Sequence, residues 1–328
     1  MSARSFRLAA ALVAAVLLLG SCFGGEECPS DASCAAPLAT PSTAQNWKRI
    51  AAAPTERQEV ASAVVDGKIY VVGGLVAGGA GTNIVEVYDP AANHWVAGPP
   101  LPIDVHHAMA SERDKRLMIM GGFSNSTGGA ATDRVFILEG GRWIDGPALR
   151  RPRAAAAAVT VKDEIVLVGG ISNAGHVSAT EIFDGSRWRD ASPIPSLRDH
   201  LGAATDGNRW VYAAGGRREG RHFASFEVYD VESDRWRSLP DMPTARSGLG
   251  SAFIGPAFVV TAGGEGPRIF PEVEMFDESR DRWTRLPDLA VPVHGVGVVV
   301  VGSKLYALVG GSRVGLGPTR AAQVLAVG

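Results

Sequence analysis

The chain has 328 residues, of which 46% are hydrophobic and 40 are glycine, so it has enough apolar side chains to fill a globular core. This apolar content excludes a disordered chain, and the glycines lack the three-residue period of collagen. Basic residues number 32 and acidic residues 34, which leaves no overall positive charge to attract phosphates and disfavours a nucleic-acid-binding function.

The first 22 residues have the pattern of an export signal. Arg4 and Arg7 give a positive start, and an unbroken apolar run follows over residues 8–20. The run is shorter than the about 20 apolar residues that a permanent membrane-spanning helix needs. The sequence LGSC at residues 19–22 resembles the bacterial lipobox, in which the cysteine becomes the first mature residue and carries lipid. We therefore predict lipidation of Cys22; the alternative is ordinary signal-peptide cleavage that leaves this cysteine unmodified.

The two other cysteines, Cys28 and Cys34, form a candidate local disulfide, because disulfides persist in exported proteins. A metal site on this pair is disfavoured, since no histidine lies nearby in the sequence. We expect a lipoprotein signal peptide over residues 1–21, a lipidated cysteine and flexible linker over 22–44, and a folded domain over 45–328. These features predict a protein of the bacterial cell envelope, tethered to a membrane on its extracytoplasmic side.

Two ladders of special residues repeat through the folded domain with a period of about 47 residues. Double glycines recur at Gly73-Gly74, Gly121-Gly122, Gly169-Gly170, Gly215-Gly216, Gly263-Gly264 and Gly310-Gly311. The second ladder consists of Trp47, Trp95, Trp143, Trp188, Trp236 and Trp283. The equal spacing of both ladders indicates one supersecondary unit in six copies.

Each copy has the pattern of four strands. In the first copy, an apolar stretch over residues 60–65 is followed by an Asp-Gly turn and by a second apolar stretch that ends at the glycine pair, as in a hairpin of buried strands. A third strand over residues 84–89 and a fourth around Trp95 follow a polar loop. The glycine pair, the aromatic residue before an aspartate and the tryptophan about 21 residues beyond the glycines resemble the Kelch repeat. This resemblance implies an all-β, six-bladed β-propeller of four-stranded antiparallel blades.

The order of the two ladders predicts how the propeller closes. Trp47 precedes the first glycine pair, and no tryptophan follows the last one. We therefore expect residues 46–50 to supply the fourth strand of a blade whose other three strands lie in residues 293–328. Such pairing would leave no sheet edge exposed at the junction of the two ends.

Long loops are expected at one end of the propeller, between the second and third strands of each copy. Binding sites are commonly built on long loops held by a rigid scaffold. At the same end, a ring of charged residues is predicted to surround the mouth of the central channel: Arg57, His106, His107, Arg153, Arg198, His200, Arg246 and His294. As a set, convergent guanidinium groups favour an anionic ligand. The structural alternative, common in the Kelch family, is that each arginine bonds to loop carbonyls.

The histidines of this ring also raise a metal hypothesis, because three imidazoles can hold zinc. His200, His294 and one of His106 and His107 lie on different blades, but we expect these positions to be too far apart around the channel. We therefore predict no metal site and no cofactor. Galactose-oxidase-type copper chemistry, known among Kelch propellers, is excluded because all five tyrosines fall in blade strands and no cysteine follows Cys34.

The expected function is that of a monomeric, lipid-anchored propeller that binds a protein or glycan ligand through its long-loop face. The alternative is an enzyme similar to the periplasmic sialic-acid mutarotase, which acts on an acidic sugar. Its acid and base would come from Glu56, Glu59, Asp104, Asp199, His107 and His200. Because these residues form no diagnostic catalytic motif, binding is favoured over catalysis.

Overall fold

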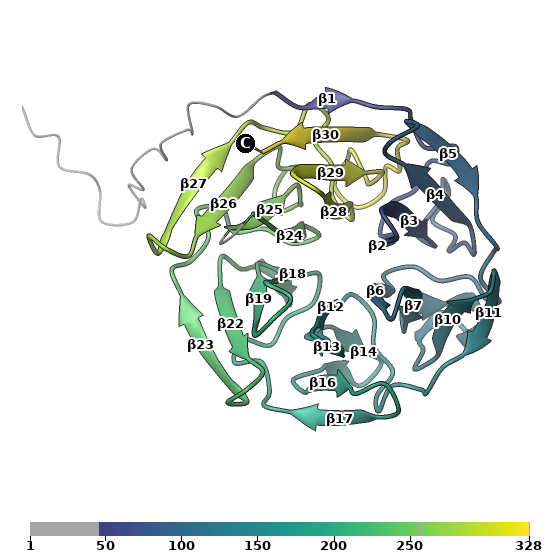
Figure 1. Cartoon of the computed structure of the whole chain (residues 1–328), viewed down its shortest axis with the longest axis horizontal. Helices are drawn as coiled ribbons and strands as arrows, with labels where there is room; N and C mark the ends of the chain where they lie inside the picture. The colour runs from purple at the N-terminus through teal and green to yellow at the C-terminus, as the bar shows by residue number, and fades with distance from the viewer. Residues whose placement is uncertain (1–45, 256–257, 328) are drawn as a thin grey trace, which may run out of the picture. The chain divides into compact units, whose positions relative to one another are not determined.

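The computed structural model describes residues 46–255 and 258–327, and within these residues the strands form six four-stranded antiparallel sheets around a common axis (Figure 1). The prediction of an all-β, six-bladed propeller is confirmed. Cys22, Cys28 and Cys34, together with the predicted signal peptide and linker, lie outside the described residues. In the described part of the chain, no helix combines the length and the apolar character needed to cross a bilayer.

The blades are numbered in chain order, and the strands of each are given from the axis to the rim. Blade 1 contains β2 (Ala61–Val65), β3 (Lys68–Val72), β4 (Val85–Asp89) and β5 (His94–Ala97). Blade 2 contains β6 (Met109–Arg113), β7 (Arg116–Met120), β10 (Val135–Glu139) and β11 (Arg142–Asp145). Blade 3 contains β12 (Ala157–Val161), β13 (Glu164–Val168), β16 (Thr180–Phe183) and β17 (Trp188–Ala191). Blade 4 contains β18 (Gly202–Thr205), β19 (Trp210–Ala214), β22 (Phe226–Asp230) and β23 (Arg235–Leu239). Blade 5 contains β24 (Gly250–Ile254), β25 (Phe258–Ala262), β26 (Val273–Asp277) and β27 (Arg282–Leu286). Blade 6 contains β28 (Gly297–Val301), β29 (Lys304–Leu308), β30 (Ala322–Ala326) and β1 (Lys48–Arg49).

The middle strands of a blade are buried on both faces because each blade packs between two others. In β4, for example, the first four residues are buried. The outer strand alternates instead, and in β5 only Trp95 is buried. The blade interfaces therefore form the hydrophobic core, and the rim of the propeller faces solvent.

The six tryptophans of the ladder join each blade to the chain segment that leaves the preceding blade. The indole of Trp95 donates a hydrogen bond to the Ala51 carbonyl at 2.8 Å. The same bond joins Trp143 to Pro99, Trp188 to Pro147, Trp236 to Ser192, Trp283 to Pro240 and Trp47 to Pro287. A buried indole needs a partner for its N–H, so the repeated carbonyl fixes the distance between neighbouring blades.

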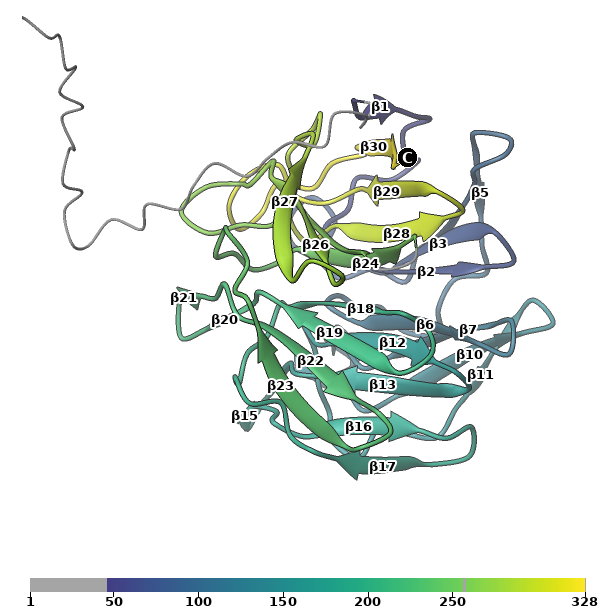
Figure 2. The same ribbon diagram turned by 60° about the vertical axis from the view of Figure 1, so that its left-hand side comes forward.

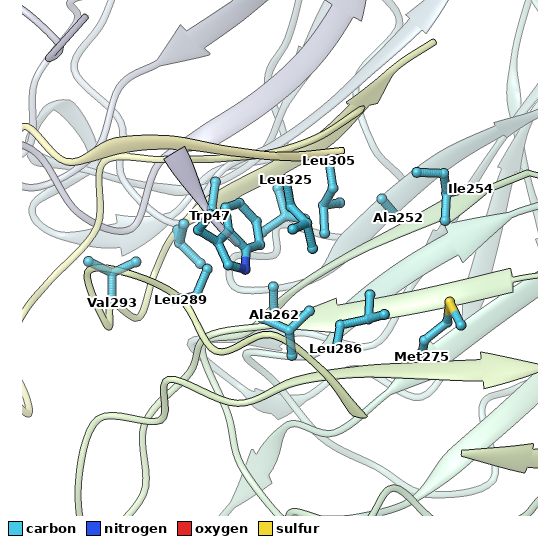
Figure 3. Close-up of a cluster of buried hydrophobic side chains, with 14 residues drawn as sticks. Trp47, Ala252, Ile254, Ala262, Met275, Leu286, Leu289, Val293, Leu305 and Leu325 are labelled. Carbon is cyan, nitrogen blue, oxygen red and sulfur yellow. The ribbon is translucent and has the colours of Figure 1, made fainter. Parts of the chain in front are cut away.

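The two ends of the domain close the propeller as predicted. In β1, Lys48 lies opposite Val324 and Arg49 opposite Gln323 of β30, so the first strand of the chain completes the last blade (Figure 1). Trp47 precedes this strand and packs in a buried cluster with residues such as Leu289 and Leu325 (Figure 3).

One glycine pair was predicted one residue out of register. In blade 1, Gly73 and Gly74 both have positive φ, and the Gly74 N–H donates to the next blade at the Val105 carbonyl. In blade 6 the two positive-φ positions are Val309 and Gly310, and it is Gly310 that donates to the next blade. A valine therefore occupies the first position of the sixth pair, which the spacing of double glycines alone could not indicate.

The long loops gather at one end of the propeller, which we call the long-loop face. In the described residues, three of these loops contain small hairpins: β8 (Phe123–Ser124) with β9 (Ala130–Ala131), β14 (Ile171–Ser172) with β15 (Gly175–His176), and β20 (Arg217–Arg218) with β21 (Arg221–His222). A 3-10 helix, η1 (Asn125–Thr127), lies within the first hairpin. The labels of β15, β20 and β21 mark this face at the left of Figure 2.

Candidate functional site

Three successive positions precede the innermost strand of every blade, and their side chains point in three directions. The buried position is occupied by Arg57, Val105, Arg153, Arg198, Arg246 and Val293, whose carbonyls accept from the glycine pair of the preceding blade. The loop position is occupied by Gln58, His106, Ala154, Asp199, Ser247 and His294, each bridged to its own blade's long loop. The ring position is occupied by Glu59, His107, Ala155, His200, Gly248 and Gly295.

The arginines of the buried position do not face the channel mouth. Arg57 is fully buried and donates through Nη1 to backbone carbonyls, including that of Gly73 at 3.0 Å, and through Nη2 to Glu86 at 2.6 Å. Arg153, Arg198 and Arg246 are also fully buried and pair with Glu181, Glu227 and Glu274. The prediction that these four arginines contact a ligand is therefore wrong, and the structural alternative is confirmed. Burial lowers the pKa of Arg57, while the Glu86 carboxylate opposes this effect.

The repeat itself shows that each arginine and glutamate form one unit of the core. In blade 2 the equivalent residues are Val105 and Phe136, and in blade 6 they are Val293 and the neutral Gln323. Where the arginine is missing, the glutamate is also missing, because either charge alone would be buried without a partner.

The residues of the ring position form a closed ring of backbone hydrogen bonds around the axis. Each N–H donates to the carbonyl of the ring residue in the preceding blade. For example, the Glu59 N–H donates to the Gly295 carbonyl at 2.8 Å, and the Gly295 N–H donates to the Gly248 carbonyl at 2.7 Å. All six residues have φ between 51° and 63°, the left-handed region. Glycine enters this region freely, whereas other residues are strained by about 1–2 kcal/mol each. Strained side-chain-bearing residues on the axis point to a functional site.

Three side chains of the ring converge. Glu59, His107 and His200 each place one potential ligand atom within 4.8 Å of the others. Glu59 Oε2 lies 3.2 Å from His107 Nε2. The expectation that the histidines would be too far apart is wrong for His107 and His200, because the hydrogen-bonded ring draws this position close to the axis. The ring and the residues after it line a cavity of about 90 Å³.

A second layer of polar side chains surrounds the two histidines. Asp199 accepts a hydrogen bond from His200 Nδ1 and also contacts His176 Nε2 at 2.7 Å. Arg217 donates to His200 Nε2 at 2.9 Å and to Glu265 at 2.9 Å. The Nδ1 atoms of His106 and His107 lie 2.6 Å apart, so one of them donates to the other.

His294 is fully buried beneath this cluster. Its Nε2 donates to the Arg313 carbonyl at 3.0 Å, and its Nδ1 lies 3.2 Å from Glu59 and 3.6 Å from Glu265. Burial disfavours the charged imidazolium, but these carboxylates raise the pKa of His294 above its usual value. Burial lowers the pKa of His107 to about 3, so this imidazole is neutral at physiological pH. Burial would raise the pKa of Glu59, but the neighbouring histidines hold it well below its usual range.

The structure thus brings together four of the predicted ring residues, His106, His107, His200 and His294, and excludes the four arginines. Glu59 and Asp199, expected only as acid or base candidates, belong to the same cluster. Glu56 lies apart from it, exposed beside Arg320. Asp104 lies at its edge: it accepts from the Asn125 N–H in a loop, and its charge acts on His106. Sequence reasoning did not select Glu265 and His176 as site residues. Glu265 bridges to Ser247 at the loop position, as the repeat register implies, whereas His176 pairs with Ile171 in the hairpin of β14 and β15.

The Kelch motif model matches residues 56–102 and 198–243, which lie in blades 1 and 4. The chain is thus a six-bladed β-propeller with Kelch motifs in two of its blades. Among solved structures, one described as "Structure of YjhT" aligns with this propeller at a TM-score of 0.73 and 13% sequence identity, over 83% of this chain and 95% of that one. At this identity the likeness shows the fold alone. No curated protein matches the sequence.

Proposed function

We propose that this Kelch propeller is an exported binding protein whose long-loop face takes a glycan at the channel mouth. The observation that supports the proposal is the convergence of polar side chains from several blades at the end where the long loops gather. The partly exposed members of this cluster include Arg217 and His176, which can reach a ligand.

A glycan suits the chemistry of the cluster better than a strongly anionic ligand does. Sugar hydroxyls both donate and accept hydrogen bonds, so they can pair with carboxylates, imidazoles and a guanidinium in one site. The four buried arginines are already neutralised by glutamates, and Arg217 is paired with Asp199 and Glu265. If the long-loop face binds a protein and no glycan, that result would replace this proposal.

Saturation-transfer NMR with neutral hexoses, amino sugars and uronic acids tests the proposal directly. We expect at least one class to receive saturation from the wild-type protein, and the affinity to fall about tenfold in Arg217→Ala, which removes a charged hydrogen-bond donor. Arg187→Ala is the control, because Arg187 is 82% exposed in a turn outside the cluster. The proposal is wrong if no sugar class binds, or if Arg217→Ala and Arg187→Ala bind equally well.

A second candidate, anomer exchange of acidic sugars, is favoured by the 3.2 Å approach of Glu59 to His107. The Glu59 carboxylate can act as the base on a sugar bound at the channel mouth, and the neutral His107 imidazole can hydrogen-bond the same sugar. Exchange spectroscopy with sialic and uronic acids measures this activity. The enzymatic function is excluded if the rate of anomer exchange equals the rate in buffer, or if the rate is the same with Glu59→Gln as with the wild type.

We further propose that the chain is exported and held in a bacterial envelope through a lipid on Cys22. The support is the basic start, the apolar run and the lipobox-like sequence before this cysteine. We expect Cys22→Ser to release the protein from the membrane fraction and to stop palmitate labelling, whereas Cys28→Ser leaves both unchanged. Membrane association and labelling that persist in Cys22→Ser would show that the anchor lies elsewhere.

A further inference from the structure

We propose that Glu59, His107 and His200 form a binding site for one divalent transition-metal ion of the zinc class. Two imidazoles and one carboxylate are a donor set that zinc uses in proteins, with a coordination position left for water or a ligand. The inference concerns metal binding by the propeller itself, and so it is independent of whether the long-loop face takes a glycan.

The placement of the three side chains follows from the backbone ring. Each of them starts from a residue whose N–H and carbonyl are both fixed to neighbouring blades, so the side chains approach one another from a rigid frame. The other three ring residues, Ala155, Gly248 and Gly295, carry at most a methyl group. They leave space beside the donor atoms in the cavity that the ring lines.

The distances require only small adjustments. Ligand atoms of a tetrahedral zinc site lie about 3.3 Å apart. The three donor atoms already lie within 4.8 Å of one another. Side-chain rotations that move each donor atom by about 1 Å bring the atoms to the separation found in a zinc site. The side chains of Glu59, His107 and His200 retain between 8% and 12% exposure, which keeps them accessible to an ion from solvent.

The second layer holds both histidines in the orientation that metal ligands need. Asp199 accepts a hydrogen bond from the Nδ1–H of His200, so the ring lone pair of His200 is on Nε2. Nδ1 of His106 lies 2.6 Å from Nδ1 of His107, and it can accept a hydrogen bond from the Nδ1–H of His107 when Nε2 of His107 faces the ion. Nε2 of His107 therefore faces Glu59, and His200 has the carboxylate on Nδ1 that the carboxylate–histidine–metal arrangement requires.

Arg217 competes with the metal for His200. Its Nη2 donates to His200 Nε2 at 2.9 Å, while Nη1 is paired with Glu265. Arg217 is partly exposed at the base of a loop hairpin, so it can leave Nε2 and keep its pair with Glu265. Removing this guanidinium should strengthen metal binding, because it frees the lone pair and takes away a neighbouring positive charge.

Calorimetric titration of the purified propeller with Zn²⁺, and visible absorption with Co²⁺, test the site. We expect one ion per chain and the absorption of tetrahedral Co²⁺ in the wild type. Affinity should fall at least tenfold in Glu59→Gln, His107→Gly and His200→Gly, and should rise several-fold in Arg217→Ala. The glycine variants retain the fold because Gly248 and Gly295 already occupy the same ring position with the same φ.

His222→Ala is the matched control, because His222 lies on the same face but outside the donor set. The inference is overturned if the wild type binds no ion, or if the ring variants bind as tightly as the wild type. It is also overturned if His222→Ala weakens binding as much as His107→Gly does. Metal binding by the wild type together with weaker glycan binding by Arg217→Ala would support both proposals separately. If the protein binds a metal but no glycan, only the proposed function fails; if it binds a glycan but no metal, only the metal site fails.

Discussion

The buried pair of Arg57 and Glu86 can be tested as a unit because blade 2 contains its apolar counterpart. The side chain of Arg57 is fully buried and that of Glu86 is 5% exposed. Arg57→Val leaves the Glu86 carboxylate in the core with the Thr55 hydroxyl as its remaining side-chain partner. Removing one partner of a buried ion pair in this way lowers the free energy of unfolding by about 3–5 kcal/mol.

The double variant Arg57→Val, Glu86→Phe copies the residues Val105 and Phe136 of blade 2. Replacing both partners of a buried ion pair by apolar groups is often nearly neutral, since no charge is left without a partner. We therefore expect the double variant to unfold within about 2 kcal/mol of the wild type, less than the loss caused by either single substitution. Because each single loss is about 3–5 kcal/mol and the double loss at most about 2 kcal/mol, the double-mutant cycle should yield a favourable coupling of at least about 4 kcal/mol.

Equilibrium unfolding in urea, followed by tryptophan fluorescence, provides the four free energies of the cycle. The exposed pair of Lys68 and Asp89 in the same blade is the control, and its coupling should stay below about 1 kcal/mol. If the double variant loses the sum of the two single losses, arginine and glutamate contribute independently. The joint replacement seen in blades 2 and 6 would then need another cause.

Three other predictions concern stability. Gly73→Ala should lower the free energy of unfolding in urea by at least about 2 kcal/mol more than Gly67→Ala does. Both glycines have positive φ, but a Cβ at Gly73 would lie 2.5 Å from a carbonyl of the neighbouring blade, whereas a Cβ at Gly67 would meet open space. Trp47→Phe should cost about 1 kcal/mol by losing the indole hydrogen bond, and Trp47→Ala about 3–5 kcal/mol by losing the packing as well. A Trp47→Phe variant as stable as the wild type would exclude a specific role for that bond. The hydrogen bond from Arg209 holds the pKa of Asp230 far below its ordinary value of 3.8, so this stabilisation is complete at neutral pH and is lost as the pH falls through the acid range. The stability difference between wild type and Asp230→Asn should therefore narrow on acidification, and a constant difference in thermal unfolding would refute the assignment.

The fold could be predicted because its signals recur at fixed spacing. The tryptophan ladder marks a hydrogen bond that every blade makes to the preceding one, and the glycine pairs mark a close approach between blades. Both requirements are geometric, so few residue types satisfy them, and Val309 is the one departure from glycine among the six described pairs. The closure of blade 6 could be predicted in the same way. Each tryptophan of the ladder marks the outer strand of one blade, so Trp47 marks the outer strand of the blade that has no other ladder tryptophan.

The direction of the arginines could not be read from spacing alone. The buried, loop and ring positions are consecutive, and a shift of one residue changes where a side chain points. Assigning Arg57, His106 and His107 to one ring combined all three positions. The informative signal was the partner: glutamates at Glu86, Glu181, Glu227 and Glu274 recur in the copies that have an arginine and are absent from the two that do not. A buried pair is replaced as a pair, whereas residues that face a ligand are free to vary singly.

The ring position shows where a repeated scaffold can acquire a function. Its backbone is the same in all blades, with a positive φ that suits glycine, and two blades do carry glycine there. At Glu59, His107 and His200 the positive φ costs about 1–2 kcal/mol each. Packing in the blade interfaces does not offset this strain, because these side chains face the axis. The side chains that break the sixfold repeat are also the ones that converge on one point. A chemical role at that point is the explanation that accounts for both the strain and the convergence.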